Sequence, residues 1–313
     1  METCLVTGGA GFIGSHLCDY LIGKGYKVIC LDNLITGSKK NIEHLLNNPN
    51  FEFIKADVSQ PITYNLLPIR YLFHLASPAS PVDYQNYPEE TLLANSEGTL
   101  KMLKLALQSG AKILVASTSE VYGNPKEHPQ KESYWGNVNS FGPRACYDES
   151  KRFGEAATYV YLNKYGIDAR IIRIFNTYGP RMRKDDGRVI SNFVNQAIKN
   201  EQVTIYGEGT QTRSFCFVSD MVAGIYQAMF AKAARGEVFN LGNPEEYSMS
   251  NLAKKIREMI GSKSEIVFKP LPPDDPTRRC PDIGKAKRIL GWEPKISVDE
   301  GLQKTIEYYR AAI

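Results

Sequence analysis

The stretch T-G-G-A-G-F-I-G, Thr7–Gly14, decides the expected fold. It follows the apolar run Thr3–Thr7 and opens the amphipathic pattern Ile13–Lys24. Glycines at this spacing allow a tight turn and the close approach of a pyrophosphate, which the N–H groups at the start of the helix then bind. Many strand–helix turns carry glycines for packing alone, so the loop needs further support. The three glycines are Gly8, Gly11 and Gly14.

The first half of the chain alternates short apolar segments with helical patterns. This alternation predicts an α/β fold with a Rossmann-type, doubly wound parallel sheet. The expected strands are Thr3–Thr7, Lys27–Leu31, Glu52–Lys55, Tyr71–Leu75, Lys112–Ala116 and Ala169–Ile174. The expected helices are Ile13–Lys24, Asn41–Leu46, Thr91–Ser109 and Asp148–Tyr165. Ligands of such sheets bind at the carboxyl ends of the strands.

After Ile174 the sequence becomes richer in loops. We expect residues 1–175 to bind NAD, with residues 214–243 returning to that part, and residues 176–213 and 244–313 to form a smaller, interleaved part that binds substrate. The expected elements after Ile174 are the helices Val189–Lys199, Met249–Ile260, Gly284–Leu290 and Val298–Arg310, and the strands Gln202–Tyr206 and Glu237–Leu241.

Composition excludes several classes of function. The 313 residues carry a net charge of +4, with both signs mixed along the chain, which does not favour nucleic acid or a membrane surface. No apolar run of about 18 residues predicts a membrane span. The six cysteines have no CxxC spacing and the four histidines no ligand spacing, so we expect reduced thiols, no metal site and a cytoplasmic protein. The sequence does not exclude a membrane leader that has been removed.

The ends of the next strands favour NAD over NADP. Asp32 ends the second expected strand, where a carboxylate binds the ribose 2′-hydroxyl and repels a 2′-phosphate. Asp57 ends the third, where it either meets the adenine or caps a helix. The spacing G-x-x-G-x-x-G resembles the short-chain dehydrogenase/reductase superfamily. The resemblance implies this set of cofactor residues: Gly8, Gly11, Phe12, Ile13, Gly14, Asp32, Asn33, Thr36, Gly37, Asp57, Val58, Leu75, Ala76, Ser77, Tyr147 and Lys151.

A nicotinamide dehydrogenase needs a base for the alcohol proton. A tyrosine can serve if a nearby ammonium lowers its pKa below the ordinary value of about 10, and i, i+4 spacing places both groups on one helix face. The sequence has three matches: Tyr20–Lys24, Tyr122–Lys126 and Tyr147–Lys151. The first lies at the far end of its helix and the second contains Gly123 and Pro125. We therefore expect Tyr147 and Lys151 to act, the alternative being an unrelated surface pair.

Longer segments carry a family signature: H-L-A-S-P-A-S-P (74–81), A-S-T-S-E-V-Y-G (116–123), G-P-R-A-C-Y-D-E-S-K-R (142–152), R-I-F-N-T-Y-G-P-R-M (173–182), D-G-R-V-I-S-N-F (186–193), Y-G-E-G-T-Q-T-R-S-F (206–215) and L-G-N-P-E-E (241–246). Together they resemble the extended short-chain dehydrogenases/reductases that act on nucleotide sugars, and most of all the UDP-glucuronate decarboxylase (UDP-xylose synthase) family. The resemblance covers nearly the whole chain. Its most specific part is G-P-R-A-C-Y-D-E.

Ser119 separates decarboxylation from dehydration. Related sugar 4,6-dehydratases carry an aspartate at this place, which protonates the departing C6 hydroxyl. A serine is a poor acid for that step. A C6 carboxylate needs no such acid, because oxidation at C4 makes it a β-keto acid that loses CO2. The resemblance implies that Thr118 binds O4 and that Glu120 holds a water for protonation of C5, unless Glu120 only fixes a loop.

A UDP-sugar brings two phosphate charges, so arginines are expected around it. The resemblance implies these substrate residues: Tyr84, Asn176, Arg188, Asn192, Tyr206, Gln211, Arg213 and Arg279. Arg279, rather than its neighbour Arg278, matches the family's functional arginine and would steady the glucuronate and the enolate. The alternative for any one arginine is a solvated surface charge. One departure is Leu93, where many family members carry a lysine.

The resemblance implies an NAD-dependent carboxy-lyase that converts UDP-glucuronate to UDP-xylose and recycles a tightly bound NAD. The alternatives are a UDP- or dTDP-sugar 4,6-dehydratase or 4-epimerase, a decarboxylase that releases the 4-keto-pentose, and an inactive protein that only holds NAD or a UDP-sugar. The patterns Thr91–Ser109 and Asp148–Tyr165 are apolar on more than one face. We expect them to pair with a second subunit in a homodimer, the alternative being burial within one chain.

Overall fold

A seven-stranded parallel sheet forms the centre of the computed structural model, which describes residues 1–61, 64, 66, 68–272, 276 and 278–311. Its strand order is β11-β6-β5-β4-β1-β2-β3. The strands are β1 (Thr3–Thr7), β2 (Lys27–Asp32), β3 (Phe51–Lys55), β4 (Tyr71–His74), β5 (Lys112–Thr118), β6 (Ala169–Ile174) and β11 (Val238–Leu241). The predicted doubly wound parallel sheet is confirmed, and β11 pairs with β6 at its edge.

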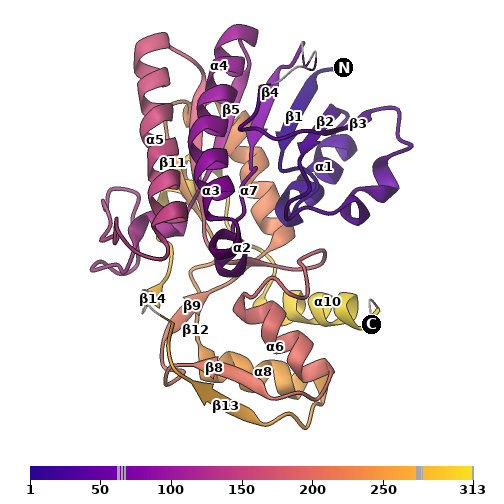
Figure 1. Cartoon of the computed structure of the whole chain (residues 1–313), viewed down its shortest axis with the longest axis vertical. Coiled ribbons are helices and arrows are strands. Elements are labelled where there is room, and N and C mark those ends of the chain that lie inside the picture. The colour runs from indigo at the N-terminus through magenta and orange to yellow at the C-terminus, as the bar shows by residue number, and fades with distance from the viewer. Residues whose placement is uncertain (62–63, 65, 67, 273–275, 277, 312–313) are drawn as a thin grey trace.

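Alternate residues of each strand bury two separate hydrophobic faces. On β1, Val6 packs with helices α1 (Phe12–Gly23) and α7 (Val218–Phe230). Its neighbour Leu5 packs on the other face, with helices α4 (Thr99–Ser109) and α5 (Ala145–Tyr165). Strand residues alternate between faces, so helices on both sides are needed to bury such apolar strands. Figure 1 shows this layered part above the smaller one.

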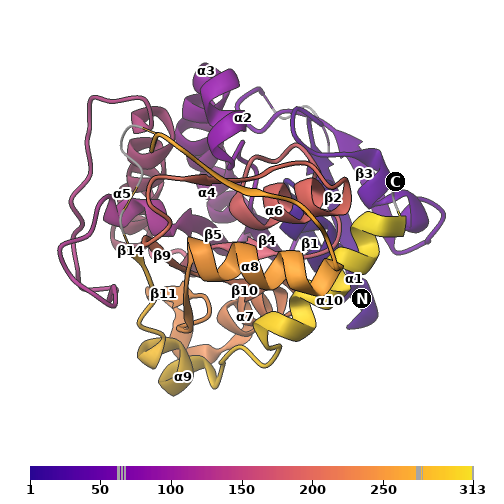
Figure 2. The ribbon, with the colours of Figure 1, turned by 90° about the horizontal axis from the view of Figure 1, so that it is seen from below.

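The smaller part is assembled from segments far apart in the sequence. Helix α6 (Val189–Ile198) packs on α8 (Met249–Ile260), and β8 (Val203–Tyr206) pairs with β13 (Ile266–Lys269). In the view from below, α8 and α10 (Val298–Ala311) lie side by side in front of the sheet (Figure 2). The remaining elements are β7 (Thr177–Tyr178), β9 (Thr212–Ser214), β10 (Cys216–Phe217), β12 (Glu246–Ser248), β14 (Arg278–Arg279) and α9 (Gly284–Leu290).

Several predicted elements differ from the observed ones. The segment Asn41–Leu46 is not an α-helix; two 3₁₀ turns, Lys39–Asn41 and Glu43–Leu45, stand there. The single helix expected over Thr91–Ser109 is α3 (Pro88–Leu93), a π-helical segment over residues 94–98, and α4. A π-segment admits an extra residue without ending the helix, and its hydrogen-bond shift leaves no mark in apolar periodicity.

Two helices were not predicted. Helix α7 is buried against the sheet, and Gly224 lets the ring of Trp292 approach within 2.9 Å of the place of a Cβ. Helix α2 (Pro81–Asn86) is only six residues long; Ser80 caps it by accepting a hydrogen bond from the N–H of Asp83 at 3.1 Å. Within the described residues, no helix is long and apolar enough to cross a membrane.

Candidate active site

A cavity of about 420 Å³ runs along the carboxyl ends of the strands and continues between the two parts of the chain. Its wall contains the predicted cofactor and substrate residues with two exceptions. Gly37 lies beside Asp32, where a Cβ would come within 2.7 Å of the carboxylate. The Asn192 side chain donates instead to the carbonyl of Gly187 at 2.9 Å. The structure therefore gathers nearly the whole predicted set around one space.

The glycine loop, Thr7–Gly14, is closely packed. Gly8 has a φ of +72°, and a Cβ there would come within 2.8 Å of the backbone of Ala76. A Cβ on Gly14 would lie 2.1 Å from the carbonyl oxygen of Gly8. Helix α1 begins after Gly11 with no side-chain cap, and its first residues line the cavity. Their free N–H groups, with the positive end of the helix dipole, suit a phosphate.

Hydrogen bonds to backbone N–H groups fix the carboxylates of Asp32 and Asp57 at the cavity wall. Asp32, at the end of β2, accepts hydrogen bonds from the N–H groups of Ala10 at 3.0 Å and Leu34 at 2.8 Å. Burial raises the pKa of Asp32. Asp57 accepts from the N–H of Ser59 at 2.7 Å, in a turn that does not lead into a helix. The helix-cap alternative for Asp57 is therefore wrong, and its carboxylate lines the cavity.

Tyr147 and Lys151 lie on one face of α5 at the cavity, and the ammonium is 5.8 Å from the centre of the tyrosine ring. The Lys151 ammonium donates to the carbonyl of Ala116 at 2.9 Å, and burial lowers its pKa to about 7. Burial also raises the pKa of Tyr147 to about 12, although a hydrogen bond with Thr118 acts in the other direction. Desolvation is the largest effect on this pKa, and a lowering by Lys151 together with a bound nicotinamide stays a prediction.

The other two Tyr-x-x-x-Lys pairs lie away from the cavity wall. Lys24 sits over the ring of Tyr20, 5.3 Å from its centre, at the far end of α1. The Tyr122 hydroxyl donates to the side chain of Asn240 at 2.8 Å, inside the protein. Only Tyr147–Lys151 combines the helical spacing with a place at the strand ends.

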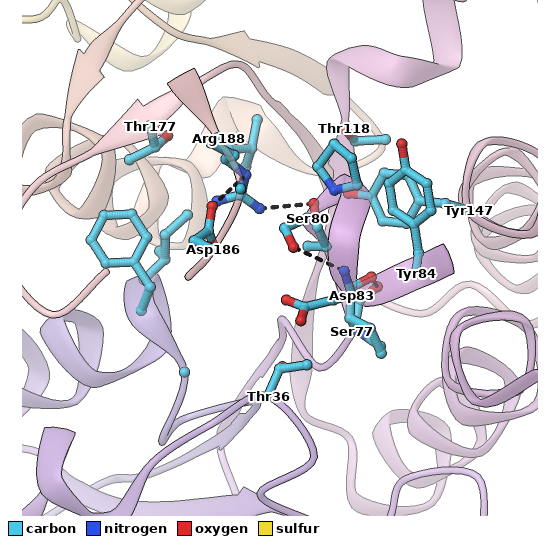
Figure 3. Close-up of a pocket in the computed structure, with 18 of the residues that line it drawn as sticks. Thr36, Ser77, Ser80, Asp83, Tyr84, Thr118, Tyr147, Thr177, Asp186 and Arg188 are labelled. Atoms are coloured by element: carbon cyan, nitrogen blue, oxygen red, sulfur yellow. Dashed lines mark hydrogen bonds and ion pairs between the residues drawn. The ribbon is translucent and has the colours of Figure 1, made fainter. Parts of the chain in front are cut away.

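Tyr84 on α2 covers the ring of Tyr147. The two rings are stacked, with centres 5.1 Å apart and planes 12° from parallel. Figure 3 shows both rings beside Thr118, with Arg188 and Asp186 across the cavity. The Tyr84 hydroxyl is buried and has no hydrogen-bond partner among the described residues. Because a buried hydroxyl without a partner is costly, this atom suits a polar group of a ligand.

Thr118, Ser119 and Glu120 follow one another where β5 ends. The hydroxyl of Thr118 accepts a hydrogen bond from the N–H of Glu120 at 3.2 Å and so caps a 3₁₀ turn, Ser119–Tyr122. The hydroxyl of Ser119 donates to Glu120 at 3.3 Å. The turn ends the strand and holds all three side chains at the wall of the cavity.

Two arginines clamp Glu120. Arg279 donates to the Glu120 carboxylate at 3.0 Å and to the carbonyl of Ser119 at 2.9 Å. Arg144 pairs with the same carboxylate oxygen. Burial opposes ionisation, but Arg279 and Arg144 lower the pKa of Glu120 to about 2. Arg279 is 1% exposed whereas Arg278 is exposed, so the structure places Arg279 and not its neighbour at the site.

Sequence reasoning did not assign the roles of Arg144 and Asp148. Arg144 precedes Tyr147 by three residues in G-P-R-A-C-Y-D-E, so its place directly before α5 was the available signal. Its guanidinium is 3.9 Å from the Asp148 carboxylate. Burial and Glu120 raise the pKa of Asp148 to about 7, against the effect of Arg144. The site thus holds two carboxyl groups with widely separated pKa values.

The cavity wall carries further cations. Arg188 donates to the carbonyl of Ala79 at 2.8 Å, and Arg213 to the carbonyl of Thr212 at 2.9 Å. Arg183, which was not predicted, pairs with Asp83 at 2.7 Å. The predicted residues Asn176, Tyr206 and Gln211 line the same region. Leu93, at the end of α3, is not part of the wall, although its neighbour Ala94 is.

Comparisons with known proteins agree on one family. The sequence model of the GDP-mannose 4,6 dehydratase family matches residues 5–305. UDP-glucuronic acid decarboxylase 1 of Arabidopsis thaliana is 54% identical over 309 residues, 99% of this chain and 70% of that protein. The protein of the same name from Xenopus tropicalis is 52% identical over 98% of this chain and 72% of its own.

A solved structure is similar over its whole length. UDP-glucuronic acid 4-epimerase from Bacillus cereus, in complex with UDP-glucuronic acid and NAD, superposes with a TM-score of 0.91. The two chains are 30% identical, and each is covered completely. The similarity therefore includes both the sheet and the smaller part.

Proposed function

Because the chain belongs to the GDP-mannose 4,6 dehydratase family, and within it to the UDP-glucuronic acid decarboxylases, we propose that it converts UDP-glucuronate to UDP-xylose and CO2 with NAD. The observation that carries the proposal is the turn after β5. Ser119 stands where a dehydratase needs an acid, and Glu120 is held between Arg144 and Arg279. This cationic pair suits a substrate with a carboxylate of its own.

The residues around the glycine loop fit NAD. A side chain on Gly14 would collide with Gly8, so the backbone is packed for a close approach. The uncapped first turn of α1 can bind the pyrophosphate, and Asp32 can accept from a ribose hydroxyl. When bound, NAD would supply reversible hydride transfer at C4 of the sugar. The cofactor is then unchanged after each turnover, which favours tight binding.

Tyr147 moves the proton of the O4 hydroxyl. Thr118, whose side chain hydrogen-bonds Tyr147, orients O4 beside it. In the structure the pKa of Tyr147 is about 12, so the base needs the charge of the Lys151 ammonium together with that of the oxidised nicotinamide. Lys151 has a pKa of about 7 and gains its charge readily when a phenolate forms nearby.

Glu120 acts as a carboxylate. A group with a pKa near 2 does not donate protons at neutral pH. Glu120 can instead accept a hydrogen bond from a water and orient it toward C5. Arg279, which reaches both Glu120 and the carbonyl of Ser119, stabilises the negative charge of the enolate left by CO2. An aspartate at the place of Ser119 would put a further carboxylate next to that of the substrate, and the serine avoids this repulsion.

The test is incubation of the purified protein with UDP-glucuronate and no added cofactor, with the nucleotide sugar followed by mass spectrometry. We expect the mass to fall by that of CO2 with no net NADH. A product of unchanged mass that separates from UDP-glucuronate by chromatography would indicate a 4-epimerase, and one lighter than UDP-xylose by two hydrogens would indicate escape of the 4-keto-pentose. Dehydration of UDP-glucose or dTDP-glucose, with UDP-glucuronate untouched, would overturn the proposal.

We also propose a homodimer that buries the outer faces of α3, α4 and α5. Leu92, Leu107 and Val160 are 46%, 40% and 50% exposed on these helices, and Phe153 is 43% exposed. Neighbouring apolar side chains at the surface mark an interaction site. Sedimentation velocity of the purified chain should show a dimer, and Val160→Lys with Leu107→Lys should convert it to monomers. A wild-type monomer would contradict this proposal.

A reducing compartment such as the cytoplasm suits the chain. All six cysteines are free thiols, and none forms a disulfide. Persistent free thiols are typical of reducing compartments. Cell fractionation with an antibody to the chain would test this location.

A further inference from the structure

Three metal-ligating side chains meet outside the active-site cavity. His128, Glu246 and Cys280 place one ring nitrogen, one carboxylate oxygen and one sulfur within 4.8 Å of one another. The His128 ring is 2.8 Å from Glu246, although the two residues are 118 positions apart in the sequence. They come from a loop, from strand β12 and from the residue after β14. No spacing rule could reveal such a group.

The three side chains are held in place by their surroundings. The second oxygen of Glu246 accepts a hydrogen bond from the hydroxyl of Thr212 at 2.6 Å. The backbone of Cys280 is fixed by Gln130, whose side chain accepts from the Cys280 N–H at 2.9 Å and whose own N–H donates to the Cys280 carbonyl at 2.9 Å. Partners of this kind orient metal ligands and increase affinity.

We propose that His128, Glu246 and Cys280 form a Zn²⁺ site. A thiolate, an imidazole and a carboxylate are the ligands that zinc prefers, and three protein ligands leave a fourth position for water. Soft sulfur disfavours Mg²⁺ and Ca²⁺, which take oxygen ligands. His128 and Glu246 are partly exposed, with 30% and 26% of their side chains accessible, so an ion can enter from solvent.

His128 and Glu246 need only a small movement to bind zinc. Zinc bonds of about 2.0–2.3 Å in a tetrahedron separate neighbouring ligand atoms by about 3.4 Å. The His128 and Glu246 atoms, now 2.8 Å apart, must open by several tenths of an ångström. The ion would replace their direct hydrogen bond, while Thr212 continues to hold the other carboxylate oxygen.

The Cys280 thiol must lose its proton to bind zinc. The Cys280 thiol lies beside His128 and Glu246 and donates a hydrogen bond to the carbonyl of Pro244 at 3.3 Å, which zinc binding would replace. Because Cys280 directly follows Arg279, a bound ion would also restrain the arginine that contacts Glu120.

The experiment titrates the chelator-treated full chain with ZnCl2 and, separately, with CoCl2. We expect one zinc per chain by elemental analysis, a thiolate-to-cobalt absorption band, and a rise in melting temperature with zinc. Cys280→Ser should abolish the thiolate-to-cobalt absorption band. His128→Ala should abolish the binding of one zinc per chain. Thr212→Val should weaken zinc binding about tenfold, as expected for a ligand's hydrogen-bond partner.

His44 supplies a matched control. It pairs with Asp19 at 2.7 Å on the surface, like His128 with Glu246, but no cysteine belongs to that pair. His44→Ala should bind zinc as the wild type does. The proposal fails if wild-type protein binds no stoichiometric zinc, or if Cys280→Ser keeps the same zinc content and melting shift. His128 is partly exposed, so its substitution tests the site even if a change at buried Cys280 impairs folding.

Discussion

The two ends of the cavity are built in different ways. At the cofactor end, one continuous turn, Thr7–Gly14, supplies the part of the wall that suits a pyrophosphate, and backbone atoms decide its shape. At the sugar end, Glu120, Arg144 and Arg279 come from three separate segments and hold one another by charge. A backbone surface leaves no room for new side chains. A charged side-chain cluster can exchange partners when an anionic substrate arrives, so the two ends should respond differently to substitution.

Tyr147, at the junction of the two ends, should give the largest effect on turnover. Tyr147→Phe keeps the ring that stacks on Tyr84 and removes only the hydroxyl. We expect kcat to fall by about 10³-fold, within the range for loss of a general base, with NAD content unchanged. Tyr20→Phe, in the first Tyr-x-x-x-Lys pair, is the control and should keep full activity. Loss of NAD in Tyr147→Phe would show that the residue belongs to the cofactor end.

Gly14→Ala should break the cofactor end. The new Cβ would lie 2.1 Å from the Gly8 carbonyl, which is backbone and cannot turn aside. We expect loss of bound NAD and a decrease of about 3 kcal/mol in the free energy of unfolding, measured by denaturant titration. Gly23, in the same helix, has nothing within 4 Å of its Cβ position. Gly23→Ala should therefore be neutral or stabilising by up to about 1 kcal/mol.

Lys151→Met should lower the turnover and raise the stability of the folded protein. Burial lowers the pKa of Lys151 to about 7, so the folded protein disfavours the ammonium. Below pH 7 Lys151 is charged in both the folded and the unfolded protein, so the full free-energy cost of burying the ammonium is present. This cost decreases as the pH rises toward the ordinary lysine pKa near 10.4. In NAD-free protein we expect Lys151→Met to be about 2 kcal/mol more stable at pH 6. The stability advantage of Lys151→Met should fade at high pH, and its turnover should fall by less than that of Tyr147→Phe.

An equal stability of wild type and Lys151→Met at pH 6 and pH 10 would contradict the buried-charge account. Lys24→Met is the control, because Lys24 is exposed at the far end of α1, over the ring of Tyr20. The comparison of both variants across pH separates the effect of burial from the loss of a lysine as such.

Arg144→Leu should have the smallest effect and act only at the sugar end. Arg279 still pairs with Glu120, so the carboxylate stays in place with a higher pKa. We expect kcat/KM to fall about tenfold, a loss of about 1.4 kcal/mol, and the acid limb of the pH–rate profile to move to higher pH. NAD content should not change. Arg70→Leu, whose side chain is 60% exposed beside Glu2, should match the wild type.

An unshifted acid limb in Arg144→Leu would mean that Arg144 does not control Glu120. A loss of NAD in this variant would contradict the separation of the two ends. Both results are read from the same purified protein, so they test the comparison directly.

Local patterns predicted which residues of the first strands and turns lie at the cavity wall. The glycine loop, Asp32 and the pair Tyr147–Lys151 depend on spacings of a few residues, which a helix or a turn converts directly into geometry. The sheet followed from the alternation of apolar strands and helical patterns. Helix α7 was missed, and the π-segment over residues 94–98 was predicted as ordinary helix, because burial and hydrogen-bond register are not visible in periodicity.

Contacts between distant segments could not be predicted in the same way. Arg144 stood in a quoted motif without a role, since only folding brings it to Glu120. The pKa of Tyr147 could not be predicted from local spacing either. Spacing predicts a lysine nearby, but the desolvation that raises the pKa depends on all the residues packed around the ring.

The sequence by itself determined the parallel sheet, the glycine loop and the face of α5 that carries Tyr147 and Lys151, because these depend on neighbours along the chain. Only the tertiary structure decided the clamp on Glu120, the stacking of Tyr84 and the meeting of His128 with Cys280. Charge pairs and desolvation act through space and fall off within a few ångströms, so their effects depend on which distant residues the fold brings together.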